Sequence, residues 1–193
     1  MREKEKIFLA NYKQYAINLI DYPKNIGELS SKTWKEFSID EVGEISSGRD
    51  IYEKERIRGD IPYISAKSKD NGIGYFVGNN NNTLESNCVS VNRNGSVGYA
   101  FYHPYKALFS NDCRKLCLNK NKYVSLFIVN QIICQKDKYG YGYKMGTERL
   151  KRQKILLPVD SYGNPDYEFM ESYMKKIEYE KINKYLEYIQ AKN

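Results

Sequence analysis

The residues best suited to chemistry gather between Lys136 and Lys154, a stretch that holds seven basic and two acidic residues. Its central part reads KYGYGYKMGTERLKRQK, so tyrosines alternate with glycines before a run of lysines and arginines. Tyrosine rings stack on nucleic-acid bases, and lysine and arginine side chains bind phosphates. This combination favours contact with a nucleic acid over catalysis.

The spacing within this stretch indicates which side chains would act together. If residues 147–153 form a helix, Arg149, Arg152 and Gln153 lie close by i+3 and i+4 spacing, whereas Lys151 points elsewhere. In an extended segment the alternating tyrosines would share one side, and the glycines between them permit close approach of the backbone. A solvated basic loop is the alternative. The candidate contact residues are Tyr141, Tyr143, Lys144, Arg149, Lys151 and Arg152.

Two further stretches carry side chains that match DNA groups. In VNRNGS, Arg93 matches a guanine edge, and Asn92 or Asn94 matches an adenine edge. The alternative is that Asn94 and Gly95 only form a tight type I′ hairpin turn. In ISAKSKDNG, Lys67 and Lys69 are typical of phosphate contacts.

Catalytic and metal-binding patterns are weak. His103 is the only histidine and has no partner nucleophile in the sequence pattern, so a structural role is favoured. The four cysteines include one C-x3-C spacing, for which buried reduced thiols are favoured over a zinc site. GNPDY is similar to the Asn-Pro-Pro-Tyr loop of amino-methyltransferases but has Asp166 in place of the second proline, so it favours a helix start. We expect no catalytic residue, bound metal or cofactor in this chain.

The pattern of apolar residues predicts an α+β fold, with short twisted strands and hairpins followed by a long C-terminal helix. We expect an N-terminal amphipathic helix over residues 2–20 with a linker over 21–33, a mixed domain over 34–160 and a helical region over 161–193. Further helices are predicted over 122–136 and from Thr147, and strands near 34–48, 61–66, 73–78, 88–102, 115–118 and 155–159.

The C-terminal helix, predicted over residues 166–190, is longer than a small domain needs to cover itself. Packing on its own domain and pairing with another helix both fit this length. The second reading predicts a homodimer formed through the helices. The apolar stripe expected to pack consists of Met170, Met174, Ile177, Ile182, Leu186 and Ile189.

The chain has 193 residues and a formal net charge of +7, which favours a polyanionic partner. It shows no signal peptide and no apolar run near 18 residues, so we expect a cytoplasmic protein without a membrane anchor.

The order of motifs from Trp34 to about Gln190 resembles the target recognition domain of type I restriction–modification specificity subunits. It is also similar to the specificity modules of fused type II systems. The segments that carry this resemblance are WKEFSIDEVGEISSGRD, GDIPYISAKSKDNGIGYF, NCVSVNRNGSVGYAFYHPYKALFSNDC and YGYKMGTERLKRQKILLPV, followed by the long helix.

The resemblance implies a reader of double-stranded DNA without catalysis of its own. A partner methyltransferase would bind S-adenosylmethionine and modify adenine, and a restriction subunit would cleave. The family's specificity subunits carry two recognition domains, whereas one is visible here, which predicts pairing with a second copy and a palindromic bipartite target. LPVDSYGNPDYEF departs from the Pro-Pro…Glu-Gln pattern that often follows the domain, so the methyltransferase interface is not carried over. The alternative function is a protein-interaction adaptor or regulator of such a system that does not read DNA.

Overall fold

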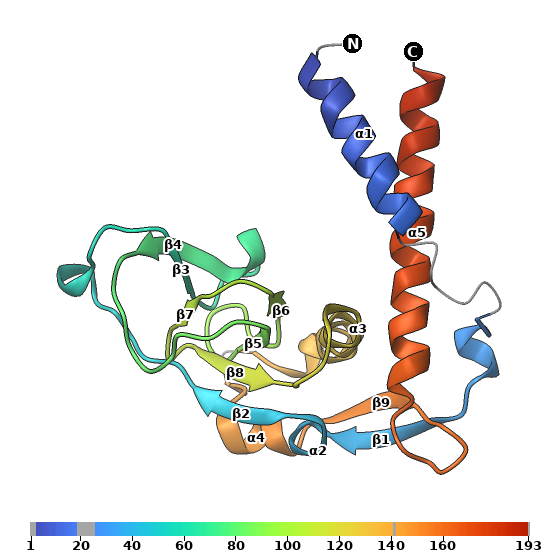
Figure 1. Ribbon diagram of the computed structural model, residues 1–193. Coiled ribbons are helices and arrows are strands. Elements are labelled where there is room, and N and C mark those ends of the chain that lie inside the picture. The colour runs from blue at the N-terminus through green and yellow to red at the C-terminus, as the bar shows by residue number, and fades with distance from the viewer. Residues whose placement is uncertain (1–2, 19–25, 141, 193) are drawn as a thin grey trace.

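The structure is a computed structural model that describes residues 3–18, 26–140 and 142–192. It confirms the α+β class, with small sheets of mostly antiparallel strands, short helices and a long C-terminal helix (Figure 1). The helices are α1 (Glu3–Asn18), α2 (Ile39–Val42), α3 (Lys122–Ile133), α4 (Thr147–Lys151) and α5 (Tyr167–Ala191). Short 3-10 helices are η2 (Leu29–Ser31), η3 (Glu53–Glu55), η4 (Asp70–Gly72) and η5 (Lys136–Lys138).

The strands form three sheets. They are β1 (Trp34–Ser38), β2 (Glu44–Ser47), β3 (Ile61–Ile64), β4 (Ile73–Val77), β5 (Cys88–Asn92), β6 (Ala100–His103), β7 (Leu108–Phe109), β8 (Cys113–Cys117) and β9 (Lys154–Pro158). The largest sheet has the order β2-β8-β5-β6 and is antiparallel throughout. The second has the order β4-β3-β7, and β1 pairs with β9 in the third.

Strand β5 lies at the centre of the main core because both of its faces are covered. Val89 and Val91 pack in a cluster with α3, and Cys88 on the other face packs with Phe109 and Cys113. All five residues of β5 are buried, so the valines on one face and the polar Ser90 and Asn92 on the other are both shielded from water. The same main cluster includes Leu150 of α4 and Ile155 and Leu157 of β9, so the basic helix is anchored to the core.

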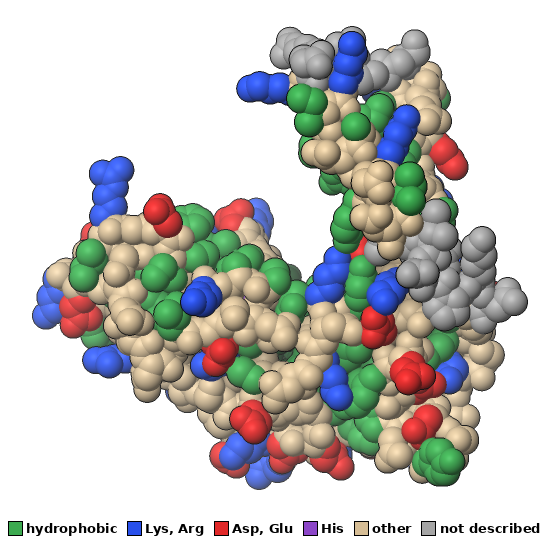
Figure 2. Space-filling view, viewed as in Figure 1, with side chains coloured by type: hydrophobic (Ala, Val, Ile, Leu, Met, Phe, Trp, Pro, Cys, Tyr) green, Lys and Arg blue, Asp and Glu red, His purple; other side chains and the backbone are tan. Residues whose placement is uncertain are grey.

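Helix α5 packs on two different partners along its length. Its first half contacts α3, where Met170 is fully buried and Met174 packs at the edge of the core. Its second half pairs with α1, where Ile182 contacts Ala16. Tyr12 faces Tyr185 and Ala16 faces Ile182, so the two helices are antiparallel. Figure 1 shows this pair rising away from the sheets, and Figure 2 shows the surface hollowed between the pair and the lobe that carries β3 and β4.

Most predicted elements are confirmed, including the N-terminal helix, the strands, the α3 and α4 helices and the long α5 helix. Part of the linker predicted over 21–33 lies outside the described residues. The expected packing residues Met170, Met174, Ile182 and Leu186 contact α3 or α1 of the same chain. Among the described helices, none is long and apolar enough to cross a membrane.

The prediction of a tight type I′ turn at Asn94 and Gly95 is wrong. β5 and β6 do form a hairpin, but their connection covers residues 93–99. Gly95 has a φ of 57°, whereas Asn94 lacks the positive φ that a type I′ turn also requires. The N–H groups of Arg93 and Asn94 donate to the Asp112 carbonyl, and the Ser96 N–H donates to the Ala66 carbonyl, so neighbouring loops hold the tip of the connection. The Gly98 N–H donates to the Asn92 carbonyl and closes the hairpin below this wider tip.

Candidate nucleic-acid interface

Three loops meet beside the end of the main sheet, and we name them together the loop cluster: residues 65–69, 93–98 and 110–112. The Ser96 N–H donates to the Ala66 carbonyl at 3.2 Å, and the Arg93 N–H donates to the Asp112 carbonyl at 2.8 Å. Gly95 lies so close to the first loop that a Cβ there would be 2.7 Å from the Ala66 oxygen. The structure therefore brings Lys67, Arg93 and Asn94 into one neighbourhood from separate stretches of sequence.

Asn92 holds the loop cluster together from inside. Its side chain is fully buried, its Nδ2 donates to the Lys67 carbonyl at 2.8 Å, and its Oδ1 accepts from the Cys113 thiol at 3.5 Å. The structure gives Asn92 this positioning role in place of the expected contact with an adenine edge.

The other expected contact residues of the loop cluster lie nearer the surface. The Asn94 amide donates to the Asp112 carboxylate. Lys67 is exposed, and its ammonium donates to the Ile73 carbonyl at 3.1 Å and lies 3.3 Å from Asp70. Lys69 is exposed.

A second surface, the basic arm, runs from η5 to the end of α4 and adjoins the loop cluster. Gly98 is the point of contact, since a Cβ there would be 2.9 Å from the Lys136 Cα. Beyond η5, backbone hydrogen bonds between Gly140 and Tyr143 form a tight turn, so the expected extended segment is wrong. The turn nevertheless stacks the Tyr139 and Tyr143 rings, with centroids 5.7 Å apart. Tyr141 lies outside the described residues.

Arg149 fixes the turn against α4. Its guanidinium carbon lies 3.7 Å from the Tyr143 ring centroid, and its Nη1 donates to the Lys144 carbonyl. Tyr143 is 52% exposed, so its ring offers a flat surface backed by a cation. Such a surface suits stacking with a base or an approach to the sugar–phosphate backbone.

The residues at the end of α4 and just after it differ in exposure and pairing. Lys151 pairs with Glu148 at 2.8 Å, and Lys154 lies 3.6 Å from Glu41. Figure 2 shows this mixture of basic and acidic side chains at the edge that carries α2 and α4. Arg152 is exposed, whereas Gln153 is buried and bonded to Tyr139 and Gln135. Of the expected group Arg149, Arg152 and Gln153, only the two arginines are therefore placed to contact a nucleic acid.

His103 is buried and structural, as expected from the sequence. Its Nε2 lies 2.8 Å from the Ser90 hydroxyl, and burial lowers the pKa of the imidazole to about 4. No group of three or more His, Cys, Asp or Glu side chains within the described ranges has the proximity a metal ion needs.

All four cysteines are free. The Cys88 and Cys117 thiols face each other across neighbouring strands. Their hydrogen bond raises the pKa of Cys88 and lowers that of Cys117 to about 7.

Sequence reasoning missed Arg114, which lies in β8 beside the loop cluster and is buried. The signal was a charged pair, Arg114 and Lys115, inside an apolar strand pattern. A charged residue in a central strand requires compensation from another group, which the sequence could not identify.

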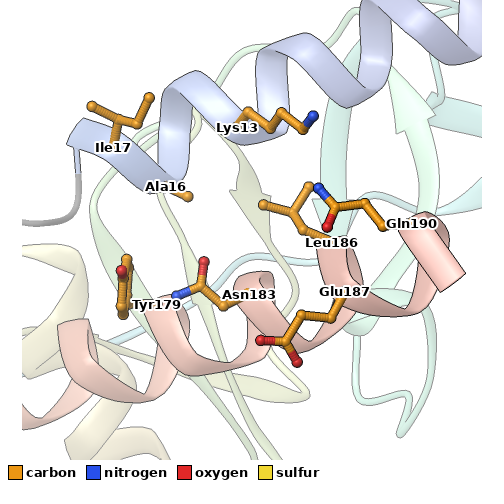
Figure 3. Close-up of a pocket in the computed structure, with 8 residues that line it drawn as sticks. All are labelled: Lys13, Ala16, Ile17, Tyr179, Asn183, Leu186, Glu187 and Gln190. Atoms are coloured by element: carbon orange, nitrogen blue, oxygen red, sulfur yellow. The ribbon is translucent and has the colours of Figure 1, made fainter.

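A third feature is the groove between α1 and α5 (Figure 3), with a volume of about 340 Å³. Ala16 and Ile17 line one side, and Tyr179, Asn183 and Leu186 line the other. Ile17 is 57% exposed, and Phe8, earlier in α1, is 50% exposed. The helix pair thus retains apolar surface beyond the contact between its two members.

Comparison with known proteins defines the class of this domain. The family model described as the type I restriction modification DNA specificity domain matches residues 31–188. This chain belongs to that family.

Particular relatives agree with this assignment. The chain is 42% identical over 176 residues to the specificity subunit S.BcgI of the type II restriction enzyme BgcI from Heyndrickxia coagulans. The match covers 90% of this chain and 52% of that protein, so the chain spans about half the length of the curated relative.

Solved structures share the fold. The S subunit of a type I restriction–modification system from M. genitalium matches 93% of this chain and 50% of its own, with a TM-score of 0.59 and 17% identity. The HsdS subunit from Thermoanaerobacter tengcongensis matches 97% of this chain and 47% of its own, with a TM-score of 0.55 and 12% identity.

Proposed function

We propose that this chain reads a DNA sequence and directs a partner adenine methyltransferase, and a restriction subunit where one exists, to that sequence. The observation that carries this proposal is membership of the DNA specificity domain family over residues 31–188. The loop cluster and the basic arm support it, because they place Arg93, Arg149 and Arg152 on adjoining surfaces of one domain.

In this proposal the chain supplies recognition and its partners supply catalysis. The methyltransferase, and not this chain, would bind S-adenosylmethionine and transfer the methyl group. Phosphate contacts would provide most of the affinity for double-stranded DNA and make it dependent on salt. Base contacts from the exposed loops would provide the sequence preference. A cytoplasmic location follows from this role, because substrate and partners are there.

We also propose that two copies associate through the helices. The exposed apolar side chains of α1, including Ile7, Phe8 and Ile17, support this, as does the groove beside α5. A symmetric pair would place two recognition domains on one duplex and favour a target with two half-sites.

The test is to co-express the chain with a candidate methyltransferase subunit in a host lacking adenine methylation and to map methylated adenines in the genome. Methylation at a single motif that requires both proteins is the expected result. Methylation that is identical without the chain would contradict the directing role and favour an adaptor that does not read DNA.

A further inference from the structure

Arg114 is a buried cation without a bound carboxylate. Its residue is 5% exposed, and its Nη1 donates to the carbonyl oxygens of Asn111 at 3.0 Å and Cys113 at 3.1 Å. Its Nε is buried and has no hydrogen-bond partner in the described part of the chain. Within the same ranges, Arg114 forms no ion pair within 4.0 Å of an acidic side chain, so neutral oxygens hold this charge.

Arg93 places a second cation beside the first. Val91 lies opposite Arg114 in the pairing of β5 with β8, and Arg93 follows two residues later, where the chain continues beside Asp112. Positions two residues apart along a strand share a face, so Arg93 and Arg114 are diagonal neighbours. The Arg93 side chain has no hydrogen bond or ion pair to another described residue, and the residue is partly exposed.

The groups around Arg114 make its positive charge less favourable. Burial lowers the pKa of the Arg114 guanidinium, and the neighbouring Arg93 charge lowers it further, against weaker opposition from Asp112. One oxygen of the Asp112 carboxylate accepts from the Asn94 amide. A desolvated cation is costly unless an anion compensates it, and the protein supplies only part of that compensation here.

We propose that Arg93 and Arg114 form one phosphate-binding site of the domain, and that its ligand is a backbone phosphate of the DNA duplex. This inference rests on the proposed function, since it assumes that the loop cluster faces DNA. Arg93 contacts the phosphate, and Arg114 is a positioning residue that adds positive potential from beneath. A phosphate compensates the buried charge, whereas a guanine edge is neutral and does not. This assignment replaces the guanine contact expected for Arg93.

The decisive variant is Arg93→Gln, tested by titration of one duplex at several salt concentrations. Loss of one phosphate contact should reduce the slope of log affinity against log salt by about 0.9. The motif enriched from random duplexes should stay the same, because a phosphate contact carries no base information. Lys184→Gln, which removes one charge from an exposed position on α5, is the matched control and should leave both slope and motif unchanged.

Arg114 is tested by Arg114→Gln and Arg114→Lys, each checked by thermal melting before titration. The glutamine variant should lose salt slope, and the lysine variant should recover most of it, which loss of packing alone would not produce. If Arg114→Gln fails to fold, Arg93→Gln still carries the test.

Two results would overturn the phosphate site. One is an unchanged salt slope with loss of a guanine from the motif in Arg93→Gln, which would make Arg93 a base reader. The other is binding by Arg93→Gln that is indistinguishable from the unmodified chain. A failure of the proposed function is separate, because the unmodified chain would then show no motif before any variant was compared.

Discussion

Two buried titratable residues of the domain differ in charge: one is neutral and the other is a cation. His103 sits in β6 with hydroxyl groups from Ser90 and Tyr105 around its ring, and burial favours the neutral imidazole. Arg114 in the same sheet keeps its charge, because a guanidinium cannot lose its proton under ordinary conditions. At the residue scale, the neutral histidine serves the fold, whereas the retained charge suits an external anion.

The single histidine predicts a measurable pH dependence of stability. Its pKa is lowered from 6.5 to about 4, so its stabilising contribution is complete above pH 6.5 and is lost as pH falls toward 4. Between pH 7 and pH 5, urea unfolding of the unmodified chain should lose roughly 1–2 kcal/mol from this group. His103→Gln should lose that much less over the same interval. Equal pH dependence of the two proteins would show that His103 is already protonated or exposed.

Neutralising the basic arm should weaken binding to DNA. With Arg149, Lys151 and Arg152 all changed to glutamine, we expect the salt slope to fall by between about 1 and 3. The contribution of Lys151 should be the smallest, because Glu148 already pairs with it. Fluorescence anisotropy with a labelled duplex measures this, and unchanged affinity would remove the basic arm from the interface.

At the scale of elements, the glycines of the β5–β6 connection hold the two surfaces together. Gly98 has a φ of 79°, and its position against Lys136 leaves no space for a side chain. Because η5 is followed directly by Tyr139, this contact helps to set where the basic arm lies relative to the loop cluster, together with Leu150 in the core.

Gly98→Ala should therefore cost stability and DNA affinity together. A non-glycine residue at this positive φ costs on the order of 1–3 kcal/mol, and the clash with Lys136 adds to it. Gly140→Ala is the control, because no atom of the described residues beyond its chain neighbours lies within 4 Å of its added Cβ, and it should change stability by less than about 0.5 kcal/mol. Urea unfolding of both variants makes the comparison, and equal stability of the two would contradict the role of Gly98.

Helices and strands could be predicted from the sequence where a single local pattern of residues determines them. Asp166 caps α5 through the Phe169 N–H, and β5 places valines at alternate positions, so both were visible in sequence. The shape of the β5–β6 connection was not, because it depends on hydrogen bonds to Ala66 and Asp112 from distant segments. Asn92 was misjudged and Arg114 was missed for the same reason, since the pairing of β5 with β8 contributes to burying both residues.

At the scale of the whole molecule, the antiparallel pair of α1 and α5 extends away from the sheets, as Figure 1 shows. Part of the apolar stripe of α5 packs against α3 and α1 of the same chain. A long helix was expected to need such packing partners. The exposed apolar side chains of α1 are the part that a second copy would cover. An isolated pair of helices with such side chains favours further association.

Ile17→Gln should reduce self-association and leave the recognition domain folded. Ile17 lies on the groove of Figure 3 and is 57% exposed, so the change removes apolar surface without disturbing a core. Sedimentation velocity should show a larger monomer fraction for this variant than for Tyr162→Gln, a control at an exposed aromatic far along the chain. A monomeric unmodified chain, or a dimer unaffected by Ile17→Gln, would contradict pairing through this surface.

Selection from a pool of random duplexes at near-physiological salt would show whether this domain reads DNA sequence. The purified chain should be used alone and together with its candidate methyltransferase. We expect one enriched motif, with two half-sites if two copies bind. Salt-sensitive binding without an enriched motif in either arm would contradict this expectation.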